Sequence, residues 1–181
     1  MFDQTFTLSR HLKLAACFAA GLCIFSIPQA HANPVLGYWA SDGSIIHITE
    51  TEGNLSAIVV ALMEPNYTEG EEYGPVGAPR RDDLNPEEAR RTDPVLGLEL
   101  LKNYTYGGKR WEGKIYDPES GNTYSSRMEV DRKGNLKMRG YIGVPMLGRT
   151  AIFEPVSSCK PHIREMLAKT PSLTDQRCDP Q

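Results

Sequence analysis

The sequence is poor in the residues that metal and nucleophilic chemistry usually require. Its 181 residues include four histidines and four cysteines, and none of them has the His-x-x-x-His or Cys-x-x-Cys spacing of a metal site. The chain also lacks the G-x-S-x-G turn of serine hydrolases and the G-x-x-x-x-G-K-[ST] loop that cradles phosphates. We therefore expect no metal, no cofactor and no catalytic residue, and predict that the protein is not an enzyme.

An excess of positive charge and a long apolar run are also absent. Twenty Lys and Arg residues stand against 23 Asp and Glu residues, a formal net charge of −3, which excludes the basic surface of a nucleic-acid-binding protein. No internal stretch of 18 apolar residues occurs, so a protein with several membrane-spanning helices is excluded. Hydrophobic residues make up 40% of the chain, enough for the core of one domain.

The N-terminal region has the pattern of a secretory signal peptide. A short basic stretch at residues 10–13 precedes the apolar residues 14–27, and Ala-His-Ala follows at residues 30–32. We predict cleavage after Ala32, a periplasmic or secreted protein, and no transmembrane segment after cleavage. The apolar run is too short for a retained membrane anchor. Lipidation at Cys17 is disfavoured because this residue lies at the start of the run rather than at its end.

Two cysteines, Cys159 and Cys178, remain after the predicted cleavage. An even pair in an exported chain favours a disulfide, because the compartments outside the cytosol are oxidising. Closing a loop of this length would stabilise the fold by about 3 kcal/mol. The alternative is a pair of unpaired thiols.

Short segments of β-branched or alternating residues, separated by turns, predict an all-β fold. The clearest are three segments in which apolar and polar residues alternate, joined by the turns D-P-E-S-G-N and D-R-K-G, as in an antiparallel meander with one wet face. With residues 95–101, which return the chain to the core, we count about eight strands, enough for a small closed barrel. The segments are residues 35–40, 44–49, 55–62, 95–101, 110–116, 123–130, 136–142 and 149–153.

Two further regions complete the predicted organisation. Residues 63–92, after the third strand, are rich in proline, glycine and charge, and predict a polar, partly mobile insertion loop or a functional lid, with about one helical turn at residues 86–91. Residues 161–170 predict a short helix that begins at a proline. The expected divisions are a signal peptide at 1–32, a barrel at 33–154, and a C-terminal helix and tail at 155–181.

Several motifs resemble those of one bacterial family. Residues 83–90 and 94–101 resemble its segments N-P-D-x-x-x-R and P-L-x-G-L-x-L-L. Residues 111–124 resemble W-x-G-x-I-Y-D-P-x-x-G-x-x-Y, and residues 136–150 resemble L-x-x-R-G-Y-I-G followed by L-G-R-T. The family is domain of unknown function 2147, which comprises small exported bacterial proteins, and the resemblance covers roughly residues 34–153.

This resemblance implies an antiparallel, eight-stranded, lipocalin-like (calycin-like) barrel and a periplasmic location. It implies no established activity, so no catalytic residue is carried over. Many members have a cysteine pair in the loop before P-L-x-G-L, and this chain has none there. The segment Gly37-x-Trp39 looks like the G-x-W start of lipocalin-type barrels, in which the tryptophan closes one end. The alternative is an ordinary core tryptophan.

Two arginines, Arg139 and Arg149, have two possible roles. They could stack on Trp39 or Trp111 and hydrogen-bond open strand-end carbonyls. As ligand-binding residues they would instead hold a carboxylate or a phosphate.

Three functions remain compatible with the sequence. The first is a carrier of a small apolar or amphipathic ligand, the second an envelope protein that binds another protein through the long loop or a barrel face, and the third an unrecognised hydrolase. Small residues at inward-facing strand positions favour a cavity inside the barrel. The same alternation places Val59 and Ile115 on the lining of this cavity. The candidate ligand-binding residues are Trp39, Trp111, Met128, Met138, Arg139 and Arg149.

Other polar residues that could carry chemistry have ordinary explanations. Asp117 and Glu119 are close in sequence to Glu112, but both lie in a turn in which aspartate commonly bonds the backbone. His47 lies on an apolar strand and is expected to be a core or rim residue rather than a ligand.

Overall fold

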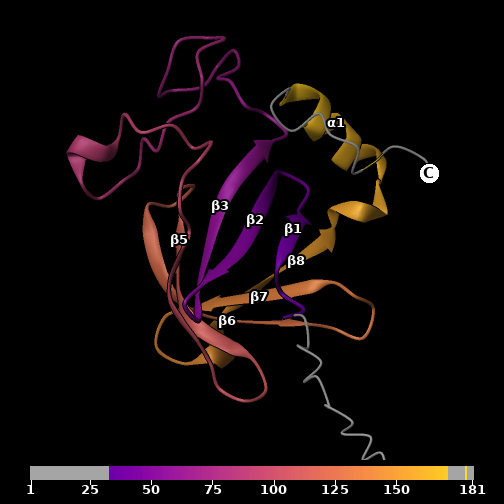
Figure 1. Cartoon of the computed structure of the whole chain (residues 1–181). Helices are drawn as coiled ribbons and strands as arrows, with labels where there is room; N and C mark the ends of the chain where they lie inside the picture. The colour runs from indigo at the N-terminus through magenta and orange to yellow at the C-terminus, as the bar shows by residue number, and fades with distance from the viewer. Residues whose placement is uncertain (1–32, 171–177, 179–181) are drawn as a thin grey trace, which may run out of the picture. The chain divides into compact units, whose positions relative to one another are not determined.

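Eight antiparallel strands form a closed barrel, in which each strand pairs with its neighbours in the sequence and β8 pairs with β1 (Figure 1). This computed structural model describes residues 33–170 and 178; the predicted signal peptide and most of the C-terminal tail lie outside the described residues. The strands are β1 (Gly37–Ala40), β2 (Ser44–Thr51), β3 (Asn54–Leu62), β4 (Leu101–Tyr106), β5 (Trp111–Asp117), β6 (Asn122–Val130), β7 (Leu136–Tyr141) and β8 (Arg149–Pro155). The predicted all-β barrel is confirmed.

The helical elements are short. They are η1 (Glu88–Arg90), η2 (Pro145–Leu147), η3 (Val156–Ser158) and α1 (Pro161–Lys169). The first confirms the helical turn expected in the long loop, and the last confirms the predicted C-terminal helix. Within the part of the chain that the structure describes, no helix has the length and apolar character needed to cross a membrane.

The fourth strand begins later than the sequence predicted. Residues 97–100 form backbone hydrogen bonds with β3, but the ladder to β5 starts at Leu101 and runs to Tyr106. The sequence pattern was obscured here because the register shifts between Lys102 and Thr105, and Asn103 between them has a φ of 55°. A bulge of this kind interrupts the alternation that identifies a strand.

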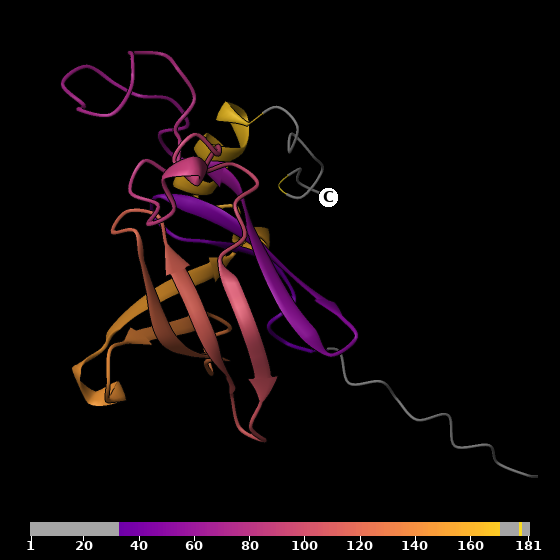
Figure 2. The same ribbon diagram turned by 90° about the vertical axis from the view of Figure 1, so that its left-hand side faces the viewer.

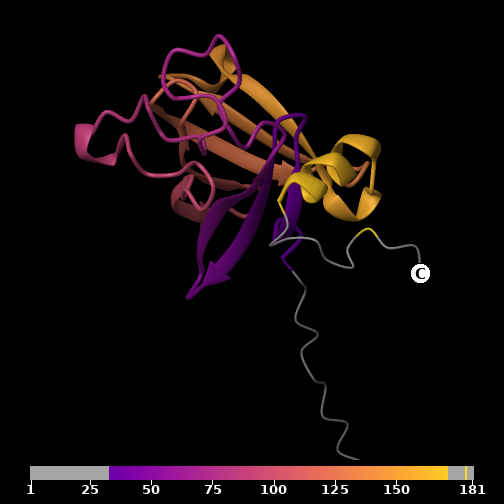
Figure 3. The ribbon, with the colours of Figure 1, turned by 90° about the horizontal axis from the view of Figure 1, so that it is seen from above.

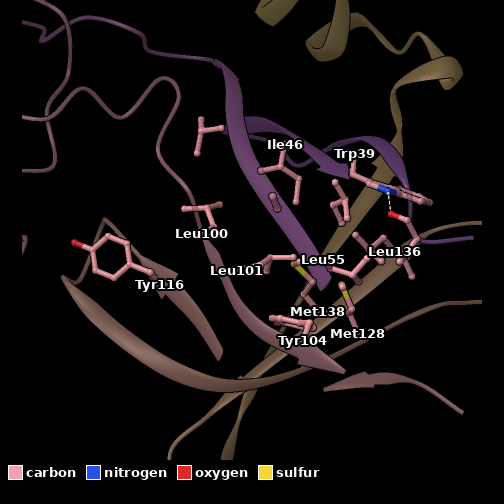
Figure 4. Close-up of a cluster of buried hydrophobic side chains, with 14 of the residues drawn as sticks. Trp39, Ile46, Leu55, Leu100, Leu101, Tyr104, Tyr116, Met128, Leu136 and Met138 are labelled. Carbon is pink, nitrogen blue, oxygen red and sulfur yellow. Dashed lines mark hydrogen bonds between the residues drawn. The ribbon is translucent and has the colours of Figure 1, made fainter. Parts of the chain in front are cut away.

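The barrel interior is filled by the inward stripe of alternating side chains (Figure 4). Trp39 donates a hydrogen bond from Nε1 to the carbonyl of Val35 at 2.8 Å, which satisfies the polar atom of its indole inside the core. The large side chains that are almost fully buried in this cluster include Ile46, Ile48, Leu101, Tyr104, Met128 and Leu136.

A second apolar cluster lies on the outer side of the barrel wall, under α1. Val60 is an extra residue in β3, because Ile45 pairs with Ala61 while the next residue, Ile46, pairs with Val59. The bulge places Ala61 on the same side as Ile45, where both contact α1. Figure 3 shows α1 beside these strands. The helix packs there with its buried face of Ile163, Met166 and Leu167.

The C-terminal cysteines are bonded to each other. Cys159 and Cys178 form a disulfide with a Cα–Cα distance of 5.2 Å, as predicted. Cys178 also packs against the cluster under α1. The bond therefore ties the tail back to the helix, and it fits a protein of an oxidising compartment.

The segment at residues 63–92 is less solvated than the sequence suggested. Asp82 is fully buried, and its carboxylate accepts hydrogen bonds from Tyr116 Oη at 2.7 Å and from Asn85 Nδ2 at 2.6 Å. Tyr116 belongs to β5 and lies at the edge of the interior cluster, with its hydroxyl directed away from the other labelled side chains (Figure 4). The segment is thus held onto the barrel by a buried polar network, which its many prolines and charges did not indicate.

A second polar contact, between Arg80 and Glu71, joins two parts of the 63–92 segment. Arg80 donates two hydrogen bonds of 2.6 Å to the carboxylate of Glu71, a bidentate ion pair. Hydrogen bonds from Thr68 and from Arg80 lower the pKa of Glu71 to about 2. The side chain of Arg80 also lies over the ring of Tyr67, at 5.7 Å from its centroid.

Replacing Tyr116 by Phe tests the network around Asp82. The substitution removes one donor from a buried carboxylate, so the free energy of unfolding should fall by about 1.5–3 kcal/mol. Urea denaturation followed by circular dichroism measures the change. The matched control is Tyr106→Phe, because the hydroxyl of Tyr106 makes its bond to Gly108 at the surface. An equal loss in both variants would contradict a special role for the buried bond.

Loss of the disulfide should loosen the C-terminus and leave the barrel folded. In the double variant Cys159→Ser, Cys178→Ser, we expect faster amide hydrogen exchange in α1 and unchanged exchange in β5–β7, because those strands close their ladders without the tail. A bond closing a loop of this size contributes about 3 kcal/mol. Faster exchange throughout the barrel would show instead that the tail supports the whole fold.

Candidate ligand-binding site

The outer face of β6 and β7 carries positive charge. In both strands the polar residues alternate with core residues such as Met128 and Met138, so the polar side chains face outward. The strand register places Arg127 directly opposite Arg139. The next outward pair is Glu129 with Lys137.

The loop between β7 and β8 folds back towards this face. It contains η2, drawn as a short orange coil at the lower left of Figure 2, away from the 63–92 segment at the top. Arg139 holds it: Nε donates to the carbonyl of Pro145 at 2.6 Å and Nη2 to the carbonyl of Met146 at 3.0 Å. Its Nη1 donates to Thr150 Oγ1 of β8 at 2.8 Å. One guanidinium therefore joins the loop to two strands.

A cavity of about 610 Å³ lies between this loop and the strands, within the size range of small-molecule sites. We call it the cationic groove, since its lining has four cationic side chains and one carboxylate. Methionine, proline and threonine side chains supply the rest of the wall. The lining residues are Arg110, Arg127, Met128, Glu129, Lys137, Arg139, Pro145, Met146 and Thr150.

The positive charge in the groove is only partly compensated. Lys137 forms an ion pair with Asp131 at 3.2 Å, and backbone hydrogen bonds from Asn135 and Lys133 help to lower the pKa of this aspartate. Among the ion pairs of residues 33–170, none includes Arg127 or Arg139. Like charges directly opposite each other on a sheet are destabilising. A bound anion would remove this repulsion.

The structure separates the residues that were predicted to form one pocket. Arg139 lines the groove, whereas Trp39, Trp111 and Met138 belong to the buried interior. Met128 belongs to the interior and also forms part of the groove wall. Arg139 donates hydrogen bonds to two loop carbonyls, which resembles the structural role expected for it, hydrogen bonding to backbone carbonyls at strand ends.

Arg149 is exposed on β8, opposite Gly140. It therefore lies next to the β7–β8 loop, and it is not among the residues that line the groove.

The interior has less free volume near Gly113 than its small residues suggested. A Cβ at Gly113 would lie 2.5 Å from the ring of Tyr104, so this ring occupies the space. The Tyr104 hydroxyl and the Ser126 hydroxyl are buried close to each other, and among the described residues neither has another hydrogen-bond partner. Burial raises the pKa of Tyr104 to about 12, and its hydroxyl stays neutral at physiological pH.

Other candidate groups make structural contacts. Asp117 accepts hydrogen bonds from the Glu119 amide at 3.0 Å and from Ser120 Oγ at 2.7 Å, which is turn chemistry as predicted. The ring of His47 stacks on Tyr38 with centroids 3.9 Å apart. Among residues 33–170 and 178, no group of three or more His, Cys, Asp or Glu side chains is arranged to hold a metal ion.

The sequence analysis missed three of the four cationic groove residues: Arg110, Arg127 and Lys137. Arg110 directly precedes the buried Trp111 of β5. Arg127 and Lys137 alternate with buried residues on β6 and β7, and all three strands were predicted correctly. The D-R-K-G turn would have indicated the β6–β7 register, and with it the facing arginines. From the wet face of β6 and β7, the predicted site included Arg139 alone.

Replacing Arg127 by Gln should stabilise the protein in the absence of ligand. The substitution removes the repulsion with Arg139, and with it the weaker attraction to Glu112, which lies opposite Arg127 on β5 but forms no ion pair with it. The free energy of unfolding should therefore rise by at most about 0.5 kcal/mol at low ionic strength. The gain should shrink with added salt, which screens the charges. Urea denaturation at two salt concentrations measures it, with Arg132→Gln in the exposed β6–β7 turn as the control. A fall in stability would mean that Arg127 has a stabilising partner.

Comparisons with known proteins agree with this architecture. The model of a family described as uncharacterized protein conserved in bacteria (DUF2147) matches residues 37–154. A solved structure of a Helicobacter pylori protein, described as belonging to the lipocalin family, aligns with a TM-score of 0.53 and 19% identity. The alignment covers 77% of this chain and 97% of that one. At this identity the likeness shows the fold alone. No curated protein matches the chain.

Proposed function

We propose, from the finding that the chain belongs to the bacterial DUF2147 family, that it is a non-catalytic binding protein of the cell envelope. Its ligand is a small amphipathic molecule with an acidic group, a carboxylate or a phosphate. The observation that carries this proposal is the cationic groove, in which Arg127 lies opposite Arg139 of β7. Glu112 of β5 lies opposite Arg127 on its other side, but among the described residues Arg127 forms no ion pair. Lipocalin-like barrels offer a rigid scaffold for such a site.

The groove suits a ligand with two chemically different ends. Arg127 and Arg110 provide charged donors that suit the oxygens of a carboxylate or phosphate. Met146 and Pro145 provide an apolar wall for a hydrocarbon chain. Arg139 holds the loop that forms this wall, and the register of β6 and β7 places Arg127 beside it.

Export completes the proposal. The N-terminal signal pattern and the disulfide between Cys159 and Cys178 are consistent with a periplasmic or secreted protein. The absence of a recognised catalytic motif in the sequence supports binding rather than catalysis.

Calorimetric titration with decanoate and with decanol tests the acidic end of the ligand. The two probes share the hydrocarbon chain and differ in the charged group. We expect decanoate to bind more tightly than decanol, and Arg127→Gln to weaken decanoate binding by about tenfold, because a hydrogen bond to a charged group is lost. Decanol binding should be unchanged in this variant.

The control for this titration is Arg132→Gln, which removes one exposed cation outside the groove. It should bind decanoate as the parent does. Equal affinities for decanoate and decanol, or no binding of decanoate and decyl phosphate by the parent, would refute the proposal. Native mass spectrometry of the exported protein would then show whether any other ligand is retained.

A further inference from the structure

The loop between β7 and β8 exposes a cluster of large apolar side chains, which we call the apolar tip. Met146 is 88% exposed and Leu147 is 81% exposed. Ile142 and Val144 belong to the same loop and are also exposed. Four such residues in six positions form a patch of the kind that marks an interaction site rather than scattered surface residues.

The backbone of the loop is held so that these side chains stay outside. The guanidinium of Arg139 donates hydrogen bonds to the carbonyls of Pro145 and Met146. Within the loop, the amide of Leu147 bonds the carbonyl of Val144, and the amide of Gly148 bonds that of Pro145. The carbonyls of Val144, Pro145 and Met146 are therefore all hydrogen-bonded, while the apolar side chains of the loop are exposed to solvent.

Cationic side chains surround the apolar tip. Arg149 follows the loop directly and is exposed. Arg127 and Lys137 line the same cavity as Met146. This local charge contrasts with the acidic balance of the whole chain, which has a formal net charge of −3. An apolar insertion flanked by cations complements the surface of an anionic bilayer, where hydrocarbon lies beneath negative headgroups.

We propose that the apolar tip docks the protein onto the surface of a membrane that contains anionic lipids. Ile142 and Leu147 enter the boundary between headgroups and acyl chains, and Arg149 contacts the headgroups. Docking of this kind would place the mouth of the cationic groove at the bilayer surface. The inference rests on the exposure and charge of the loop and does not require the proposed ligand.

Co-sedimentation with lipid vesicles tests the docking surface. We expect the parent protein to bind vesicles of mixed phosphatidylcholine and phosphatidylglycerol, with binding that falls in high salt and is much weaker on phosphatidylcholine alone. The double variant Ile142→Ser, Leu147→Ser should lose at least about fivefold in partitioning, because it removes the inserted apolar surface.

The matched control removes two exposed apolar residues elsewhere. Tyr73 and Val76 lie in the 63–92 segment and are 56% and 70% exposed, so Tyr73→Ser, Val76→Ser should leave vesicle binding unchanged. Circular dichroism confirms that each variant is folded.

Three results would overturn docking: no binding of the parent to anionic vesicles, equal loss in both double variants, or a parent dimer in sedimentation equilibrium that Ile142→Ser, Leu147→Ser abolishes. The last result would assign the tip to a second copy of this chain. Decanoate titration of the same variants separates this inference from the proposed function. Decanoate affinity retained without vesicle binding defeats docking alone, and the reverse defeats the ligand proposal alone.

Discussion

Three hydrogen bonds from the guanidinium of Arg139 connect most features of the proposed site. Two of them fix carbonyl groups of the β7–β8 loop and the third reaches Thr150 on β8. A loop held in this way forms one wall of the cationic groove and keeps Met146 directed to solvent. A lysine could not replace this side chain, because an ammonium group is a compact charge without the planar fork that reaches several acceptors at fixed angles. Groove, loop and apolar tip therefore depend on one residue.

The outer surface of the barrel is covered in different ways on its different strands. Helix α1 packs over β2 and β3, where the bulge at Val60 makes room for an apolar contact. The 63–92 segment reaches β5 through the buried bond between Asp82 and Tyr116. On β6 and β7, polar side chains on the outer face of the barrel line the groove. This face, which neither α1 nor the 63–92 segment covers in these contacts, carries positive charge that is only partly compensated, which is why we place ligand binding there.

Two buried polar arrangements have opposite consequences for stability. The carboxylate of Asp82 has side-chain donors from two residues, so its burial is compensated. The hydroxyl groups of Tyr104 and Ser126 lie in the interior with only each other as a possible partner among the described residues. Burial and hydrogen bonding to Asp82 raise the pKa of Tyr116, so this tyrosine remains a neutral donor well above neutral pH. The hydrogen bonds to Asp82 therefore stabilise the fold more than the buried hydroxyls of Tyr104 and Ser126 do.

The sequence by itself determined the fold class and most strand positions, because alternation along a strand and turn residues between strands are local properties. It also determined the cysteine pairing, since the predicted cleavage leaves a single possible pair. The fourth strand was placed too early because the bulge around Asn103 breaks the local pattern. Tertiary structure alone decided which outward residues meet: Arg127 and Arg139 are 12 positions apart and face each other only through the β6–β7 register. The sequence could not predict the burial of Asp82 either, because its partner Tyr116 lies 34 residues away on another element. Local patterns report the direction of a side chain, but contacts across strands and loops depend on how the whole chain closes.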